Sequence, residues 1–359
     1  METVELAPAG CFGGAFYRKN VLVTGHTGFK GSWLCVWLGM LGARLTGYAL
    51  DPVNDRDNFV MCGLSGKMID LRGDVRDRAR LNMAFEAYRP ELVFHLAAQP
   101  LVLRSYREPA ETFETNVMGT VNVLEAARSC GSVKAVIIVT SDKCYENREP
   151  FWGCREDDPM GGLDPYSASK GCAELAAASY RHSFFPEEKG KTVASVRAGN
   201  VFGGGDWSEF RLIPDCIRAL EANRPVELRS PESVRPWQFV LEPLSGYLLL
   251  ASQLLEGVPL DGAWNFGPEP ADSVSVGELA ELLAEIWGGS ARVRFSQEED
   301  PPREAAALRL DCTKAKLLLG WRPRMDLRTA LEYTVEWYRH DGDFLNLCES
   351  QIAGYCERM

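Results

Sequence analysis

Three glycines spaced three residues apart, Gly25, Gly28 and Gly31, constrain the possible folds of this chain more than any other feature. They follow the short apolar run 21–23 and precede apolar residues at helical spacing over 33–41. This pattern is typical of a buried strand, a tight turn and a helix. Glycine lets the backbone approach a pyrophosphate, which the N–H groups of a helix N-terminus bind. The unit predicts a dinucleotide site at Gly25, Thr27, Gly28, Phe29 and Gly31; an ordinary turn with incidental glycines is the alternative.

Apolar runs and helical patterns alternate along most of the remaining chain. Strands are expected at 44–50, from 70 onward, and at 92–99, 134–140, 192–197 and 264–267, with helices at 79–88 and 113–127. Strands that alternate with helices at short intervals predict a parallel sheet with crossover helices. The predicted fold is therefore α/β, a Rossmann-type doubly wound parallel sheet with a smaller mixed α/β substrate-binding lobe.

The smaller lobe is expected to be assembled from separate segments. Beyond residue 202 the pattern is less regular, with helices expected at 248–255, 276–287, 312–319 and 327–338. We expect residues 16–201 plus 239–267 to form the dinucleotide-binding domain, and 202–238 plus 268–345 to form the lobe. Residues 1–15 are expected to be a loose N-terminal arm, because they show no periodicity.

Several residues suited to a dinucleotide come just after predicted strands, where parallel sheets place their ligands. Asp51 lies at the distance typical of the acidic residue that binds the adenosine ribose, although an acidic turn residue before Pro52 explains it almost as well. Asp74 and Val75 are candidates for adenine contacts. The exit of the strand at 92–99 offers Leu96, Ala97 and Ala98 where the cofactor backbone would pass.

Composition argues against several classes of function. The net charge of −11 makes a nucleic-acid partner unexpected. The 11 cysteines include no CxxC pair, which favours free thiols in a reducing cytoplasm. The four histidines are far apart, so no metal is expected. The chain opens without a signal-peptide pattern, and its longest apolar segment, 247–255, is too short to cross a bilayer, so no membrane partner is expected.

Tyr166 and Lys170 are four residues apart at the start of a predicted helix, and therefore lie on one face. A lysine ammonium beside a phenol, together with a nicotinamide charge, is expected to lower the pKa of the tyrosine from ~10 toward neutral pH. Such a tyrosine exchanges a proton with a hydroxyl while a hydride moves to or from the nicotinamide. Many helices carry this spacing by chance, but the glycine unit upstream favours the catalytic interpretation.

Ser141, Asp142 and Lys143 follow the apolar run 134–140 directly. A hydroxyl, a carboxyl and an amine therefore leave a buried strand end together. We expect Tyr166 to point to the same side of that strand end. A solvated turn is the alternative interpretation, because these residue types are common in turns.

Six segments together resemble the extended short-chain dehydrogenase/reductase family of nucleotide-sugar epimerases and dehydratases. They are GHTGFKGSW, HLAAQP, TSDKCYEN, DPYSASKGCAE, VRAGNVFGGGDW and RPWQFVLEPLSGYL. The resemblance covers the chain from about residue 16 to 340, and its paired TSDK and YxxxK segments are specific. It implies a tightly held NAD that is recycled within each turnover, and a nucleotide sugar as the small-molecule partner.

The resemblance implies a 4,6-dehydratase of nucleotide-activated glucose. Tyr166, helped by Lys170, would take the proton of the carbon 4 hydroxyl, whose oxygen Ser141 would bond. Asp142 matches the acid that protonates the leaving carbon 6 hydroxyl. Lys143 stands where related dTDP-glucose enzymes have the Glu that takes the carbon 5 proton. Lysine is a poor base at its ordinary pKa of ~10.4, so Lys143 is either a base with a lowered pKa or an electrostatic stabiliser of the enolate.

Substrate contacts are expected in the loops after the strands and in the smaller lobe. The candidates are Gln99, Ser141, Asn200, Trp207, Arg235 and Gln238. Arg235 suits the nucleotide diphosphate because arginine binds phosphate bidentately. Trp207 or Trp237 is a candidate to stack on a pyrimidine, with core packing as the alternative. Asn116 is expected to hold a backbone carbonyl near Lys170, as the family's asparagine does, with a capping or surface role as the alternative.

The resemblance also supports a homodimer or homotetramer. The Ala-rich helical stretches 110–127 and 173–184 would form a four-helix seam, unless they pack within the chain. Two other functions remain open: another nucleotide-sugar dehydratase or 4-epimerase, and a non-catalytic nucleotide-binding sensor. Asp142 and Lys143 favour the dehydratase, since an epimerase needs no acid–base pair for water loss. The sequence leaves the nucleotide base open.

Overall fold

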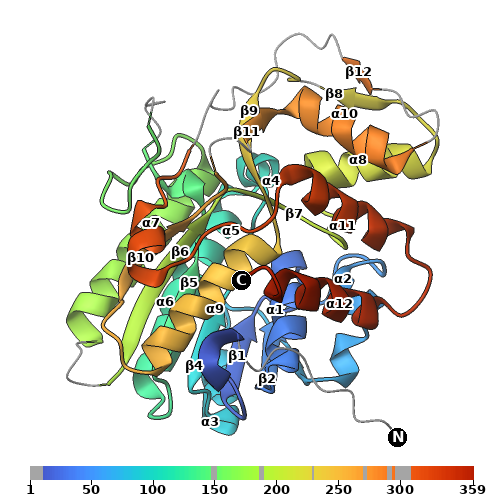
Figure 1. Cartoon of the computed structure of the whole chain (residues 1–359). Helices are drawn as coiled ribbons and strands as arrows, with labels where there is room; N and C mark the ends of the chain where they lie inside the picture. The colour runs from blue at the N-terminus through green and yellow to red at the C-terminus, as the bar shows by residue number, and fades with distance from the viewer. Residues whose placement is uncertain are drawn as a thin grey trace, which may run out of the picture.

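The centre of the molecule is a seven-stranded parallel sheet with the strand order β10-β6-β5-β4-β1-β2-β3 (Figure 1). A computed structural model of the chain describes residues 11–146, 152–185, 190–228, 230–269, 273–288, 293–295 and 309–359. The strands are β1 (Asn20–Thr24), β2 (Arg44–Ala49), β3 (Ile69–Arg72), β4 (Leu92–His95), β5 (Ala135–Val139), β6 (Thr192–Ala198) and β10 (Gly262–Phe266). This order and the flanking helices confirm the predicted Rossmann-type α/β fold.

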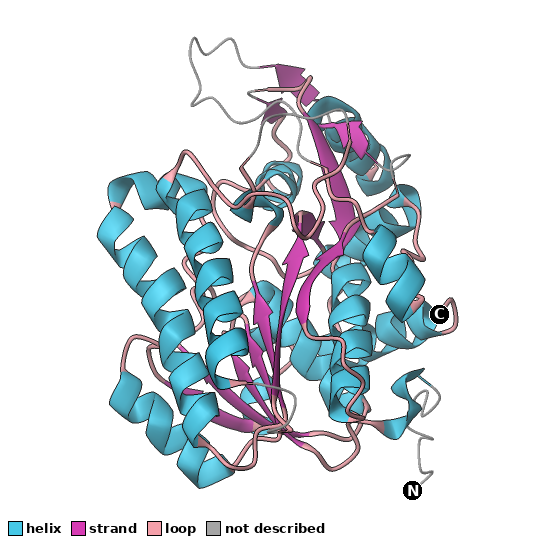
Figure 2. Cartoon of the chain, turned by 90° about the vertical axis from the view of Figure 1, so that its left-hand side faces the viewer, coloured by secondary structure: helices cyan, strands magenta, loops and turns pink. Residues whose placement is uncertain are grey.

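Alternate residues of the central strands enter two separate cores, which explains their unbroken apolar runs. Val21 and Val23 of β1 face one core, whereas Leu22 faces the other. Ile137 and Ile138 of β5 divide in the same way. Figure 2 shows helices on both sides of the sheet. The first core is covered by α1 (Phe29–Met40) and α9 (Leu241–Leu255), and the second by α3 (Arg78–Tyr88), α6 (Gly119–Ser129) and α7 (Pro165–Phe184).

Two small sheets and three helices form the smaller lobe at the top of Figure 1. One sheet has the order β11-β9-β7 and the other pairs β12 with β8. The strands are β7 (Asn200–Phe202), β8 (Val226–Leu228), β9 (Val234–Phe239), β11 (Ser273–Ser275) and β12 (Val293–Phe295), and the helices are α8 (Leu212–Glu221), α10 (Val276–Trp287) and α11 (Leu327–Arg339). The lobe's strand β7 continues the chain directly after β6, so it begins beside the carboxyl end of the central sheet.

The C-terminal helix α12 (Phe344–Cys356) was not expected from the sequence. It packs against α1, and its Tyr355 ring meets Trp37 edge-on with ring centroids 5.7 Å apart. The Tyr355 hydroxyl donates a 2.7 Å hydrogen bond to the buried Glu242 carboxylate of α9. These contacts join α12 to the face of the sheet that α1 and α9 cover.

The expected N-terminal arm is not loose in the part that the structure describes. Residues Cys11–Gly14 form the short 3-10 helix η1, and Phe12 and Phe16 are buried against the first core. Phe12 lies 5.9 Å from Trp37 between ring centroids. Within the described part of the expected arm Phe12 alone is buried, and a single aromatic anchor makes no periodic pattern; Phe16 begins the predicted domain. Residues 1–10 lie outside the described part of the chain.

The helix expected at 113–127 is three pieces. Helix α5 (Pro109–Phe113) leads into the π-helical turn η3 (Glu114–Met118), which leads into α6. Other short elements are α2 (Asn58–Met61), η2 (Leu64–Gly66), α4 (Val102–Arg107), η4 (Asp142–Cys144) and the π-helical η7 (Ala315–Leu319). Such π-turns are frequent at functional sites, and η3 carries Asn116. Within the described ranges, no helix combines the length and apolar character that a membrane span needs.

Candidate active site

The glycine turn between β1 and α1 has no room for side chains at two of its three glycines. A Cβ on Gly31 would lie 2.1 Å from the Gly25 carbonyl oxygen, and a Cβ on Gly25 would lie 2.6 Å from the Ala97 backbone nitrogen. Gly25 also has φ of +74°, a conformation that favours glycine. The turn therefore brings the backbone of β1 against the exit of β4, as a nucleotide-binding turn requires.

The start of α1 fits a bound pyrophosphate. Gly28 is the N-cap residue, it is exposed, and no side chain caps the first N–H groups of the helix. Uncapped N–H groups at the positive end of a helix are an anion site, and a glycine at the cap leaves them accessible. Thr27 next to it is held by a 3.1 Å hydrogen bond from its hydroxyl to the Leu50 carbonyl. These residues fit the diphosphate of a dinucleotide.

The residues predicted for the adenosine end follow β2 and β3. Asp51 has a side chain that is 85% exposed and lies 3.4 Å from Arg72, so its carboxylate is accessible to a ribose. Asp74 accepts hydrogen bonds from the side chain and backbone of Arg76, which hold the pKa of its carboxyl below the ordinary value. Val75 is buried against Gly119, where a Cβ would lie 2.7 Å from its methyl group.

The exit of β4 is arranged around Asn116. Leu96, Ala97 and Ala98 are partly exposed. The buried Asn116 amide donates to the Gln99 carbonyl at 3.1 Å and to the Ser169 hydroxyl at 2.8 Å, and its oxygen accepts from the Gln99 backbone at 2.8 Å. Asn116 thus joins the loop after β4 to the helix that carries Tyr166.

Both polar atoms of the Gln99 side chain have hydrogen-bond partners, in its own loop and in α5. Its amide donates to Leu101 and Thr112, and its oxygen accepts from the Leu101 backbone at 2.7 Å. Because its side-chain nitrogen and oxygen both have partners in the chain, Gln99 is not suited to be a substrate contact in this conformation. The sequence prediction missed this because the partners lie in a loop and a helix that no pattern linked to it.

Ser141 and Asp142 form a buried hydrogen-bonded pair where β5 ends. The Ser141 hydroxyl donates to Asp142 Oδ1 at 2.9 Å and accepts from the Lys143 backbone N–H at 3.2 Å. Asp142 is 2% exposed, and its second oxygen, Oδ2, has no partner among the described residues. Burial raises the pKa of the Asp142 carboxyl, against the lowering effects of Lys143 and of the Ser141 hydrogen bond. A buried carboxyl with a raised pKa and a free oxygen is suited to donate a proton.

Tyr166 meets this pair from α7. Asp164 caps the helix by accepting from the Ser167 N–H, and Pro165 occupies the first turn, so Tyr166 is fixed near the helix N-terminus. Burial raises the pKa of the Tyr166 phenol to about 12. A side-chain hydrogen bond with Ser141 lowers it, and the charge of Asp142 raises it further. The Tyr166 phenol and the Asp142 carboxyl therefore both interact with Ser141.

Lys170 does not have the position that we expected. Its ammonium donates to the Val139 carbonyl at 3.4 Å, and no hydrogen bond joins it to the Tyr166 phenol in the described part of the chain. Burial lowers the pKa of Lys170 to about 8, with Glu174 opposing that shift. In this structure burial raises the pKa of the Tyr166 phenol. The expected lowering needs the nicotinamide charge as well as Lys170, and it stays a prediction for the NAD-bound protein.

A buried ion pair beneath Lys170 fixes α7 on the sheet. Glu174 accepts from Arg197 at 2.8 Å and from Ser195 at 2.7 Å, and Thr140 also donates to it. Burial would raise the pKa of Glu174, but the Arg197 guanidinium holds it below the ordinary value. Removing one partner of such a pair typically costs about 3–5 kcal/mol, so the pair locks β5, β6 and α7 in register.

Lys143 directly follows Asp142, but its side chain is less buried than those of Ser141 and Asp142. Its side chain is partly exposed, and its ammonium makes no hydrogen bond or ion pair with described residues. Its charge is the main influence that opposes the burial effect on Asp142. Lys143 is therefore close enough to Asp142 to act on the same ligand.

The residues predicted for the sugar nucleotide lie in the smaller lobe and at its junction with the sheet. Asn200 begins β7, pairs with Trp237 of β9 and is partly exposed. Arg235 on β9 is also partly exposed. Trp207 is 7% exposed, with Arg56 stacked 3.7 Å from its ring and Tyr338 edge-on. That packing favours a role for Trp207 in the core over stacking on a pyrimidine.

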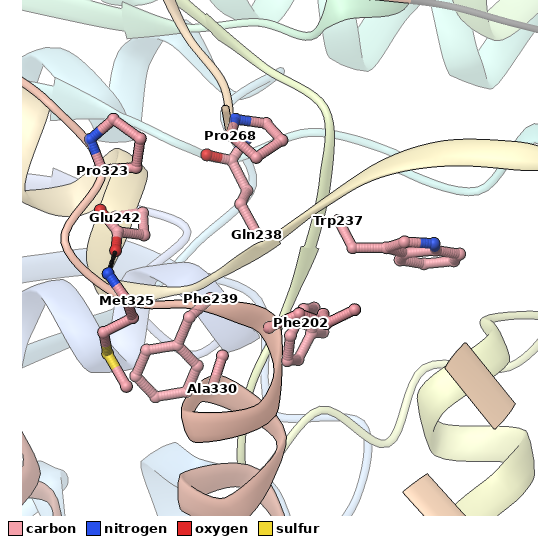
Figure 3. A pocket seen from close by; sticks show the side chains of 10 residues that line it. Phe202, Trp237, Gln238, Phe239, Glu242, Pro268, Pro323, Met325 and Ala330 are labelled. Carbon is pink, nitrogen blue, oxygen red and sulfur yellow. Dashed lines mark hydrogen bonds between the residues drawn. The ribbon is translucent and has the colours of Figure 1, made fainter. Parts of the chain in front are cut away.

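Gln238 and Trp237 line a cavity of about 10 Å³ under β9 (Figure 3). This volume is barely enough for one water, so it is not the sugar site. The Gln238 amide donates to the Phe266 carbonyl at 3.1 Å, and Figure 3 shows the Trp237 indole turned away from the other lining residues. A second cavity of about 380 Å³ is lined by residues such as Glu156, Arg181 and Lys314, and none of the predicted catalytic groups borders it.

Two basic residues near the catalytic group were missed by the sequence prediction. Lys30 is the second residue of α1, and its ammonium lies 6.0 Å from the centre of the Tyr247 ring. Arg211 precedes α8 and forms a 3.0 Å ion pair with Asp206. The charge of Arg211 acts on Tyr166 and Lys30, and that of Lys30 acts on Asp142. The sequence did contain a clue to the position of Lys30, because it is a charged residue between Phe29 and Gly31 in the glycine segment.

Replacing Lys30 by Met is expected to stabilise the protein, and more at pH 6 than at pH 9. Burial, with Arg211 and Lys170, lowers the pKa of Lys30 to about 7, against about 10.4 in an unfolded chain. The unfolded chain therefore binds more protons between these values, and wild-type stability rises with pH across that window. Because Lys30 is partly exposed, the gain at pH 6 is about 1–2 kcal/mol.

Thermal unfolding at the two pH values measures this effect. Lys67→Met, a change of the same kind at an exposed position, is the control and is expected to move the melting temperature little at either pH. An equal change for Lys30→Met at pH 6 and pH 9 would contradict the assignment of a lowered pKa.

The described residues contain no group of three or more His, Cys, Asp or Glu side chains suited to a metal ion. The carboxyl ends of the central strands carry other polar groups. They are the uncapped turn before α1, the buried Asp142 carboxyl, the Tyr166 phenol and nearby lysines. Such a set can bind a dinucleotide, move protons at a sugar hydroxyl and assist hydride transfer.

Comparisons of sequence agree with this chemistry. A family model described as GDP-mannose 4,6 dehydratase matches residues 22–334. The chain is 49% identical over 345 residues to CDP-glucose 4,6-dehydratase of Salmonella typhimurium strain LT2, covering 94% of this chain and 96% of that protein. It is 29% identical over 328 residues to UDP-glucose 4-epimerase of Mycolicibacterium smegmatis, covering 89% and 99%.

Solved structures share the fold. UDP-glucose 4-epimerase of Thermotoga maritima with UDP-glucose superposes with a TM-score of 0.75 at 26% identity, covering 89% of this chain and 98% of that one. UDP-glucose 4-epimerase of Thermus thermophilus in complex with NAD gives 0.76 at 26% identity, covering 90% and 99%. The chain therefore belongs to the GDP-mannose 4,6 dehydratase family, within the superfamily of NAD-dependent nucleotide-sugar epimerases and dehydratases.

Proposed function

We propose that this protein is a CDP-glucose 4,6-dehydratase, which converts CDP-glucose into CDP-4-keto-6-deoxyglucose and water. The observation that carries the proposal is the buried group of Ser141, Asp142 and Tyr166, in which a phenol and a carboxyl share one hydroxyl. An epimerase needs the phenol but has no use for the acid. The 49% identity to the Salmonella enzyme supports CDP as the nucleotide.

The residues of the first domain fit NAD as the cofactor. Gly25, Gly28 and Gly31 with the uncapped start of α1 would hold its diphosphate, and Asp51 its adenosine ribose. Thr27, Phe29, Asp74, Val75, Leu96, Ala97, Ala98 and Asn116 remain assigned to the same site. When bound, NAD supplies the acceptor for the hydride of carbon 4 and the donor of the hydride that reaches carbon 6.

The catalytic residues divide the proton transfers among them. Tyr166 takes the proton of the carbon 4 hydroxyl, and Lys170 supports it electrostatically. Asp142 protonates the carbon 6 hydroxyl, which leaves as water, and its unpartnered Oδ2 is free to face that group. Lys143 takes the carbon 5 proton and later returns it. The oxidised carbon 4 makes the carbon 5 proton acidic enough for this step.

Lys143 is assigned as base rather than stabiliser because no described residue neutralises its ammonium. It follows β5 directly beside Asp142, in the position where related dTDP-glucose enzymes have the Glu that takes the carbon 5 proton. The Ser141 hydroxyl and the Tyr166 phenol, the other groups near Asp142, already have proposed roles at carbon 4.

The smaller lobe would hold the nucleotide. Arg211 and Arg235 are the residues suited to its diphosphate, and Asn200 begins β7 directly after the central strand β6. We assign residues 16–201 plus 239–267 to the cofactor and 202–238 plus 268–345 to the substrate. Trp207 is assigned a packing role within this lobe because its indole N–H bonds to the Arg56 carbonyl. The Gln238 amide nitrogen donates to Phe266, but its side-chain oxygen has no partner among the described residues, so Gln238 stays a proposed substrate contact.

We also propose a homodimer through α5, α6 and α7, or a homotetramer built from it. Two apolar side chains on these segments are well exposed and support the assignment: Met118 of η3, between α5 and α6, is 51% exposed, and Leu175 of α7 is 60% exposed. The free state of all the described cysteines suits a cytoplasmic enzyme. Light scattering at several protein concentrations tests the assembly.

Turnover with a panel of nucleotide sugars tests the proposed function. Purified protein with NAD is expected to convert CDP-glucose into a 4-keto-6-deoxy product, with dTDP-glucose, UDP-glucose and GDP-mannose at least about 10-fold poorer in kcat/KM, because unpaired polar groups in the base pocket penalise the wrong base. Mass spectrometry detects the loss of one water. A CDP-galactose product would instead identify an epimerase, and no product from any sugar would support a sensor.

A further inference from the structure

Asp206 is a buried carboxylate in the loop that follows β7, and the proposed mechanism gives it no role. The residue is 3% exposed. Its Oδ2 accepts a 3.0 Å hydrogen bond from Arg211 Nη1, and its Oδ1 accepts from the Ser208 backbone N–H at 3.1 Å. Both carboxylate oxygens therefore have partners, and the partner that carries a charge is Arg211.

The loop around Asp206 is held by contacts that do not involve the carboxylate. The Trp33 indole of α1 donates to the Gly204 carbonyl at 2.9 Å, and the Tyr338 hydroxyl of α11 donates to the Asp206 carbonyl at 2.6 Å. These bonds attach the main chain of the loop both to the sheet domain and to the lobe. A buried ion pair is weak evidence for stability, because its burial costs about as much as its attraction returns. The buried charge of Asp206 therefore points to a role at Arg211.

Arg211 has one edge of its guanidinium open. The side chain is 33% exposed, and Nη1 is the only one of its side-chain nitrogens with a hydrogen-bond partner in the described part of the chain. Nε and Nη2 form the edge that binds two oxygens of one phosphate side by side. Arg211 is also the N-cap residue of α8, so an anion beside it would face the positive end of that helix.

We propose that Asp206 is a positioning residue, which holds the Arg211 guanidinium so that its Nε–Nη2 edge faces the diphosphate of the bound nucleotide sugar. This role rests on the nucleotide-sugar substrate of the proposed function and on Arg211 as a ligand of its diphosphate. An arginine side chain loses conformational entropy when it binds, and one that a fixed carboxylate already holds loses less. Asp206 acts through Arg211 and does not itself touch the substrate.

The negative charge of Asp206 also repels a diphosphate, which gives the positioning role a distinctive signature. With Arg211 present, the guanidinium pairs with the carboxylate and offsets its charge. With Arg211 removed, the same carboxylate holds nothing and only repels the phosphates. Neutralising Asp206 should therefore weaken diphosphate binding when Arg211 is present, and should strengthen it or leave it unchanged when Arg211 is absent.

Calorimetry of CDP and of cytidine binding to the NAD-loaded protein tests the positioning role. Asp206→Asn keeps the shape of the side chain and an oxygen for the Ser208 N–H, but removes the charge that holds Arg211. It is expected to weaken CDP binding on the order of 10-fold and to change cytidine binding by less than about 2-fold, because cytidine has no phosphate. Arg211→Met is expected to weaken CDP binding at least as much. Adding Asp206→Asn to Arg211→Met is expected to leave CDP affinity unchanged or to raise it.

Asp215→Asn is the matched control, because it removes a carboxylate that pairs with Arg218 within α8, close to the same loop. It is expected to change the affinity for either compound by less than about 2-fold. If Asp206→Asn does not fold, Asp206→Glu is measured in the same way. It keeps the charge but moves the carboxylate by one methylene, so the same difference between CDP and cytidine is expected.

The outcomes separate the positioning role from a structural role and from the function itself. Equal weakening of CDP and cytidine by Asp206→Asn would show that the carboxylate only supports the loop, and unchanged CDP affinity would show that it does not hold Arg211. Either result overturns the proposal, as would a wild type that binds CDP no more tightly than cytidine. A wild type that shows the expected difference but forms no keto sugar would support the positioning role and contradict the dehydratase function.

Discussion

Replacing Tyr166 by Phe is expected to lower kcat for CDP-glucose by about 10²–10⁴-fold, or about 3–5 kcal/mol in the barrier. The change removes one oxygen from a buried ring and leaves the apolar packing in place. Without the phenol, the carbon 4 hydroxyl loses the group that the proposed mechanism assigns to take its proton at the hydride step. Steady-state assays with product detection by mass spectrometry measure the loss, and KM is expected to change much less than kcat.

Tyr180→Phe is the matched control, since it makes the same chemical change on the same helix, α7, at a partly exposed position. It is expected to keep kcat within about 2-fold of wild type, in line with other surface changes. If Tyr166→Phe retained more than a tenth of the wild-type kcat while folded, another group would have to take the carbon 4 proton.

Replacing Lys143 by Met is expected to slow exchange of the carbon 5 proton with solvent deuterium by about 10²–10⁴-fold. Met keeps much of the length and apolar stem of lysine but has no basic nitrogen. Oxidation at carbon 4 does not use this amine, so the loss should appear at the exchange step and in overall kcat together. Proton NMR of the sugar in deuterated buffer measures the exchange directly.

Lys134→Met removes a lysine from the other end of β5, where Lys134 pairs with Glu91 at 3.5 Å. This control is expected to leave the exchange rate unchanged. Exchange at the wild-type rate in Lys143→Met would show that Lys143 is an electrostatic stabiliser and that the base lies elsewhere. Loss of kcat with normal exchange would place its role after the carbon 5 step.

Most of the central sheet could be predicted because each of its elements carries its own local signal. The strand 134–140 is an unbroken apolar run, since both of its faces are buried in the structure. Helix α10 begins and ends at the expected residues because Ser275 and Glu278 form a capping box before an amphipathic stretch. Helix α12 was missed, although Leu347, Gln351 and Tyr355 share one face, because its partner surface on α1 is far away in the sequence.

The chemistry of the site was predictable only where residue types are close in the sequence. Ser141 and Asp142 are adjacent, and Tyr166 lies in a helix-start pattern, so their convergence followed from strand order. The engagement of Gln99 and the burial of Trp207 depend on contacts across the fold and leave no local signal. Lys30 was overlooked because the glycines beside it already explained its segment.

The measurement that tests the proposed chemistry most directly is the fate of deuterium in CDP-glucose labelled at carbon 4. Wild-type protein with NAD, in unlabelled water, is expected to give CDP-4-keto-6-deoxyglucose with the deuterium on the carbon 6 methyl group of the same molecule. A mixture with unlabelled substrate should yield no crossover between molecules, because one site holds the sugar throughout. Deuterium lost to water, or kept at carbon 4 of an epimerised sugar, would contradict the dehydratase mechanism at Tyr166 and Asp142.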